Sequence, residues 1–131
     1  MTKEEVISTA AKWWTDKLAS IPRHDNGDNS RTSLVACLFA DMCSEPITKE
    51  QLVIFEEELI RNIRSTYENH IEHVGCHFTV IGCDYAPCSE LYSAAVGAGI
   101  NVNNFPFKTW MRIGPDYVEV SDGYRRAYER I

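Results

Sequence analysis

Alternation of apolar and polar side chains near the C-terminus is the feature that most constrains the fold of this chain. The alternation runs over residues 108–113 and again over 117–120, and Gly-Pro-Asp at 114–116 separates the two runs. A period of two places successive side chains on opposite faces of a strand, and Gly-Pro-Asp favours a tight turn. The pattern predicts a β-hairpin with one buried face and one face that displays Lys108, Trp110, Arg112, Tyr117 and Glu119.

Helical spacing of apolar residues dominates the rest of the sequence. Thr2 and Thr48 each stand three residues before a Glu or Gln, which is the capping-box pattern of a helix N-terminus. Residues 77–82 instead have the composition of a short strand. The chain is therefore predicted to be α+β, with about four helices packed on a small antiparallel sheet that includes the C-terminal hairpin. The predicted helices span residues 3–19, 33–43, 48–70 and 88–98.

Length and composition predict a single domain over residues 1–131. The chain is 44% hydrophobic and 24% charged, as folded globular proteins are. No apolar run reaches the roughly 18 residues of a membrane span, so no membrane partner is expected. The polar N-terminus does not have the pattern of a signal peptide. We therefore expect a cytoplasmic protein.

The distribution of charge limits the class of ligand. A net charge of −6 argues against a broad nucleic-acid-binding surface. Residues 105–131 differ from the rest, because they carry 5 basic and 4 acidic side chains, a net charge of +1. An anionic ligand would therefore be accommodated best near the C-terminal part of the chain.

A group of His and Cys residues between 70 and 88 is the strongest candidate for a metal site. Thiolates and imidazoles are the ligands that zinc prefers, but the chain has no Cys-x-x-Cys pair, and Gly75 is expected to end the preceding helix. Five cysteines without a secretion signal also favour free thiols. Free thiols and surface histidines are thus the favoured interpretation, and no cofactor is expected. The alternative zinc ligands are His73, Cys76, His77 and Cys83.

Catalytic motifs are scarce. Cys83, His77 and Asp84 could be combined into a nucleophile, a base and an orienting acid, although nothing in their spacing requires it. The chain has no Walker loop, no Gly-x-Ser-x-Gly and no His-Glu-x-x-His sequence. A binding protein is therefore favoured over an enzyme.

The loop that contains Asp25, Asn26 and Asp28 has two interpretations. Asn26-Gly27 favours a turn with positive φ, and Asp28 can cap a following helix. A Ca²⁺ or Mg²⁺ loop is the alternative, but the spacing of its acidic residues does not match an EF-hand.

Aromatic rings beside Lys and Arg are the main candidates for a binding site. Such residues can stack on a base and pair with a phosphate, and they also anchor protein interfaces or form a solvated sheet face. One of the adjacent Trp13 and Trp14 is expected in the core, and the other is expected to line a groove or an interface. The candidate ligand- or partner-binding residues are Trp14, Asp25, Asn26, Asp28, Asn104, Lys108, Trp110, Arg112, Tyr117, Tyr124, Arg125 and Arg126.

Several short segments form a combined pattern that spans nearly the whole chain. They are Trp14 with Lys17-Leu18, Asp25-Asn26-Gly27-Asp28, Asp84-Tyr85 with Pro87, Asn104-Phe105-Pro106 with Lys108-Thr109 and Met111, and Ser121 with Gly123-Tyr124. This pattern resembles a family of small proteins carried by phages, plasmids and other mobile elements of Gram-positive gut bacteria. The chain departs from it at Phe107, where the family has Trp, and at Asp122, where the family has Tyr. The His and Cys group is not part of the family pattern.

The resemblance implies a genomic setting in which small acidic proteins often antagonise host defences. It suggests a non-enzymatic, anti-CRISPR-like inhibitor that binds a host defence protein in the bacterial cytosol. One alternative is a sponge that sequesters an anionic nucleotide immune signal between the hairpin face and the Asp25–Asp28 loop, with a homodimer interface as a further location. Another alternative is a small zinc- or thiol-dependent enzyme that uses residues 70–88.

Overall fold

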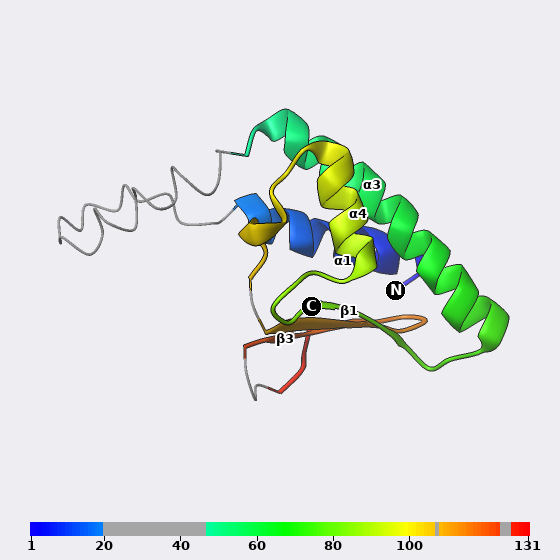
Figure 1. Cartoon of the computed structure of the whole chain (residues 1–131). Coiled ribbons are helices and arrows are strands. Elements are labelled where there is room, and N and C mark those ends of the chain that lie inside the picture. Colours follow the sequence, from blue (N-terminus) through cyan, green and yellow to red (C-terminus); the bar gives the residue numbers. More distant parts are fainter. Residues whose placement is uncertain (20–46, 107, 124–126) are drawn as a thin grey trace.

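A computed structural model describes residues 1–19, 47–106, 108–123 and 127–131. It confirms the predicted α+β class, with helices that lie on one side of an antiparallel sheet (Figure 1). The four strands follow one another in the order β1-β2-β3-β4. The strands are β1 (Thr79–Cys83), β2 (Thr109–Ile113), β3 (Val118–Asp122) and β4 (Glu129–Arg130).

The described residues contain three of the four predicted helices. The predicted helix over residues 33–43 lies outside the described residues. A π-helical turn, Glu68–Val74, continues the second helix, and a 3-10 turn, Val102–Asn104, follows the third. The three α-helices are α1 (Lys3–Ala19), α3 (Lys49–Tyr67) and α4 (Ser89–Ala98).

The ends of α3 are set by local sequence. The Thr48 hydroxyl accepts a hydrogen bond from the Gln51 amide at 3.1 Å, and the Gln51 side chain accepts one from the Thr48 amide at 2.9 Å. This reciprocal pair confirms the predicted capping box. At the other end, Gly75 has a φ of 87°, a left-handed conformation that few other residues adopt readily. The helix therefore ends at Gly75, as the sequence predicted.

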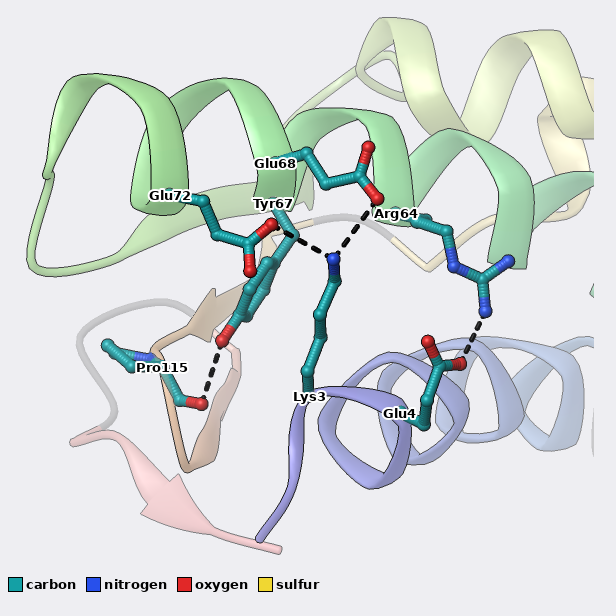
Figure 2. Close-up of polar contacts among 7 residues, drawn as sticks. All are labelled: Lys3, Glu4, Arg64, Tyr67, Glu68, Glu72 and Pro115. Carbon is teal, nitrogen blue, oxygen red and sulfur yellow. Dashed lines mark hydrogen bonds and ion pairs between the residues drawn. The ribbon is translucent and has the colours of Figure 1, made fainter.

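Polar contacts join α1 to the π-helical turn, and α3 to the β2–β3 turn. Lys3 Nζ lies 3.1 Å from the Glu68 carboxylate and 2.9 Å from that of Glu72 (Figure 2). The Tyr67 hydroxyl donates a hydrogen bond to the Pro115 carbonyl at 2.9 Å. Because Tyr67 is itself buried at the end of α3, these contacts fix the hairpin turn beneath the helices.

The hydrophobic core lies between the helices and the inner face of the sheet. Trp14 has no exposed surface and packs edge-on against Phe105, with ring centroids 6.2 Å apart. Phe55 of α3 reaches the same ring, at a centroid distance of 5.8 Å. The helical stripe of α1 therefore includes Trp14, as its spacing from Leu18 predicts.

The hairpin alternation sorts side chains as the sequence predicted. Thr109, Met111 and Ile113 are buried against the helices, whereas Trp110 and Arg112 are half-buried on the opposite side. The turn begins where the Gly114 amide donates to the Tyr117 carbonyl at 2.9 Å, which fixes the register of β2 on β3. The predicted strand at residues 77–82 joins this sheet as β1, two residues later than its expected start.

Candidate functional site

No described helix covers the second side of the sheet, which we call the outer face (Figure 1). It is formed by alternate residues of the four strands and of the segments that flank them. Two apolar side chains on it are strongly exposed, Phe78 at 41% and Val80 at 43%. The residues of the outer face are Phe78, Val80, Trp110, Arg112, Tyr117, Glu119, Tyr128 and Arg130.

Arg112 lies at the centre of this face. Its guanidinium carbon is 3.8 Å from the centroid of the Tyr128 ring and 5.2 Å from that of Phe78. The cation therefore has an aromatic ring from the C-terminal segment and another from the segment before β1. Such contacts orient a flexible Arg side chain and contribute about 0.5–1 kcal/mol each at exposed sites.

Arg130, on β4, repeats the arrangement two strands away from Arg112. Its guanidinium carbon lies 4.4 Å from the centroid of the Tyr117 ring, and its Nε donates to Glu119 at 3.2 Å. The same Glu119 carboxylate lies 3.8 Å from Arg112. One carboxylate thus serves two guanidinium groups, so the outer face retains a positive charge and N–H donors available to a partner.

Trp110 owes its position to the glycine opposite it in β1. Gly82 and Trp110 are cross-strand partners, and a Cβ at Gly82 would lie 2.1 Å from the indole Cε3. The indole therefore approaches the Gly82 backbone closely, which leaves no room for a larger residue there. This close approach extends the aromatic surface from β2 across β1.

A second polar group lies where β2 begins. Among the described residues, Lys108 is the one non-glycine residue with a positive φ, 57°. Its amide donates to the Asp84 carbonyl, its Nζ lies 2.6 Å from the Asp84 carboxylate, and the Tyr85 ring centroid is 4.0 Å away. The hydrogen bond to that carboxylate raises the pKa of Lys108. These contacts hold a backbone conformation that is unfavourable for a side chain with a Cβ.

The structure brings together only part of the predicted site. Trp110, Arg112 and Tyr117 share the outer face, while Lys108 lies at its border. Trp14 is a core residue, because its ring has no exposed surface with which to stack on a ligand. Asn104 is half-buried in the 3-10 turn, away from the strands of the outer face. The remaining predicted residues lie outside the described residues: Asp25, Asn26, Asp28, Tyr124, Arg125 and Arg126.

Sequence reasoning did not select Phe78, Tyr128 and Arg130 as site residues. The signal for Phe78 was its even spacing from Val80, which places both on one side of β1. The signal for Tyr128 and Arg130 was also a spacing of two residues, which places both on one side of the C-terminal segment. Neither signal shows which residues lie beside one another on the outer face until the order of the strands in the sheet is known.

The alternative zinc ligands do not converge. His73, Cys76 and His77 are exposed around the turn at Gly75, whereas Cys83 points into the core with 1% exposure. Within the described ranges, no group of three or more His, Cys, Asp or Glu side chains is arranged to hold a metal ion. The reason is local: the left-handed Gly75 redirects the chain, and the alternation of β1 turns Cys83 inward.

The described thiols differ strongly in exposure, and we expect their reactivity to differ accordingly. Burial raises the pKa of the Cys83 thiol, and burial raises that of Cys88 to about 11. With iodoacetamide at about pH 8, Cys88 should react much more slowly than exposed Cys76, because the thiolate is the nucleophile and burial disfavours the Cys88 thiolate. Peptide mapping by mass spectrometry after timed quenching measures each rate. Labelling of Cys83 as fast as Cys76 would instead support a thiol-dependent enzyme.

Comparison with known proteins gives no assignment, because no protein-family model matches the chain and a search of curated proteins finds no match. Among the helices of the described ranges, none has the combination of length and apolar character that a membrane crossing requires.

Proposed function

We propose that this protein is a non-enzymatic inhibitor that binds a partner protein through the outer face of its sheet. One observation carries the proposal: helices cover one side of the sheet, and the other side displays four aromatic rings around two arginines. Trp, Tyr and Arg are the residues that most often dominate the binding energy of protein interfaces.

The side chains of this face are held in place by contacts within the chain. The Arg112 guanidinium is held between two rings, and the Trp110 ring lies against Gly82. Immobilising a flexible side chain on binding costs about 0.5–1.5 kcal/mol, so a face already ordered binds with a smaller loss of entropy. A face of this kind fits a protein surface that offers carbonyl and carboxylate acceptors to the N–H groups of Arg112 and Arg130.

The nucleotide-sponge alternative is less favoured by the same geometry. A base needs a free ring face on which to stack, but the rings of Tyr128 and Tyr117 already have an arginine against them. The Tyr85 ring is likewise covered by Lys108, whose ammonium group is paired with Asp84. A nucleotide that stacks on the covered faces of these tyrosine rings would have to displace those contacts, whereas a protein partner can bind over them.

The class of partner rests on the family resemblance. Small acidic proteins of phages and other mobile elements often antagonise host defences, so we propose a defence effector in the bacterial cytosol as the target. The mode of action would be anti-CRISPR-like, meaning that inhibition follows from occupying a surface of the effector and requires no reaction.

Replacing Arg112 by alanine tests this assignment. A panel of purified defence nucleases is incubated with the protein, and both complex formation and residual nuclease activity are measured. For an inhibited nuclease, Arg112→Ala should weaken binding at least about 30-fold, the effect of losing a hot spot of about 2 kcal/mol. Circular dichroism and the thermal midpoint establish that the variant is folded.

Arg61→Ala is the matched control. Arg61 is on α3, its side chain is 72% exposed, and it forms an ion pair with Glu58 within the same helix. Its removal should leave inhibition unchanged. Equal losses for both variants would mean that the helical side is the interface, and the absence of binding to any effector would contradict the proposal. Uptake of ATP or a cyclic dinucleotide, seen by native mass spectrometry and lost in Arg112→Ala, would favour the sponge.

A further inference from the structure

A second feature with the properties of a binding surface is the edge of β1 that faces away from β2, with which no strand of the described sheet pairs. β1 and β4 are the outer strands of the sheet. The Gly114 amide donates a hydrogen bond to the Tyr117 carbonyl, on the β3 side of the hairpin. Because hydrogen-bonding direction alternates along a strand, the backbone groups of Arg112 and Trp110 also point toward β3, and those of Met111 point toward β1. The N–H and C=O of Val80 consequently point away from β2, because hydrogen-bonding direction alternates along a strand.

An independent contact supports this assignment of which backbone groups of β1 point away from β2. The Cys88 amide donates to the Gly82 carbonyl at 2.9 Å from outside the sheet, which shows that Gly82 also points outward. The loop that contributes Cys88 covers the end of β1 and leaves the part around Val80 uncovered by it. The part of the edge that the described residues leave open is therefore short, centred on Val80 and preceded by Phe78.

The two edges of the sheet differ in chemistry. Natural sheets protect their edges with very short strands, charged residues or proline. β4 has this protection, since it consists only of Glu129 and Arg130. β1 does not have it: residues 75–83 contain no Lys, Arg, Asp, Glu or Pro, and both Phe78 and Val80 are more than 40% exposed.

We propose that β1 pairs with β1 of a second copy of this chain, antiparallel across a twofold axis. An antiparallel strand pair is self-complementary, so a single unprotected edge suffices for a closed dimer. Phe78 of each copy then faces Val80 of the other, and the two exposed apolar side chains cover each other. The two four-stranded sheets join into one, and the two outer faces become continuous.

Two properties of this dimer follow from the structure. The open edge is too short to bury the roughly 800 Å² per partner of a standard interface, so the dimer dissociates in the micromolar range or above. Each copy has a net charge of −6, so the copies repel each other, and added salt strengthens the dimer by screening that repulsion.

Sedimentation velocity over protein concentrations from about 1 μM to about 1 mM tests the proposal. The wild-type chain should change from monomer to dimer within this range. Val80→Pro removes the N–H that points away from β2 and leaves the hydrogen bonds between β1 and β2 in place. Proline is also tolerated on strand edges. It should weaken the dimer at least about tenfold, because two interchain hydrogen bonds are lost.

Val80→Thr is the control, since it keeps the N–H and the β-branched shape, and it should dimerise like the wild type. If Val80→Pro does not fold, Val80→Lys serves instead, because it keeps the backbone and places two like charges near the axis. A wild-type chain that stays monomeric throughout, or a folded Val80→Pro that dimerises as tightly as Val80→Thr, would overturn the proposal.

Amide hydrogen exchange locates the interface independently of these variants. The Val80 amide should exchange more slowly at high protein concentration than at low concentration, because pairing protects it. The Ile81 amide points toward β2 in both states and should not change. A dimer in which Val80 shows no added protection would place the interface elsewhere.

Discussion

Replacing Phe55 by alanine is expected to lower the free energy of unfolding by about 3–5 kcal/mol, the usual range for a fully buried phenylalanine. Phe55 has no exposed surface, and its ring centroid is 5.8 Å from that of Phe105, which also contacts Trp14. Alanine at this position would leave a cavity where α1, α3 and the segment before β2 meet. Because small domains have about 5–15 kcal/mol of stability in total, the variant would be close to unfolding at physiological temperature.

Urea denaturation followed by circular dichroism measures this loss. Val53→Ala is the control, because Val53 is on the same helix but is 56% exposed. A substitution at such a position usually changes stability by less than about 0.5 kcal/mol. If Phe55→Ala were no more harmful than Val53→Ala, the core between α3 and Phe105 would not be packed as described.

The helices and the hairpin were predictable because their signals are local. The reciprocal bonds of Thr48 and Gln51 involve residues three apart, and the alternation of β2 is visible in five consecutive side chains. Trp14 shows the same principle, since its spacing from Leu18 predicts burial. Selecting it as a binding residue gave more weight to the chemistry of its ring than to its position in the helical stripe.

The binding face was predictable only in part because its contacts are between residues far apart in the sequence. Alternation shows that Arg112 and Trp110 share a side of β2. It cannot show that Phe78 and Tyr128 lie beside Arg112, because that depends on which strands flank the hairpin. The conformation of Lys108 has no local signal at all, since the ion pair with Asp84 spans more than 20 residues.

Alanine substitutions at Gly82 and Gly97 are expected to change stability in opposite directions. At Gly82, the new Cβ would lie 2.1 Å from the Trp110 ring and 2.9 Å from the Thr109 carbonyl oxygen, so the indole must move away from the sheet. Overpacking of this kind costs about 1–3 kcal/mol. Gly97 instead lies within α4, and the nearest heavy atom to its new Cβ, in Glu58, is 3.5 Å away, an ordinary contact.

Gly97→Ala should therefore stabilise the protein by about 0.4–1 kcal/mol, because alanine restricts the unfolded chain and favours a helix. Thermal and urea unfolding of the two variants, in parallel with the wild type, measure both effects. Gly82→Ala should also impair any binding that Arg112→Ala impairs, since it displaces Trp110 from the same face, whereas Gly97→Ala should not. A Gly82→Ala variant as stable as the wild type would show that the indole does not rest on β1, and the ordered aromatic surface from which we infer the binding function would lose its support.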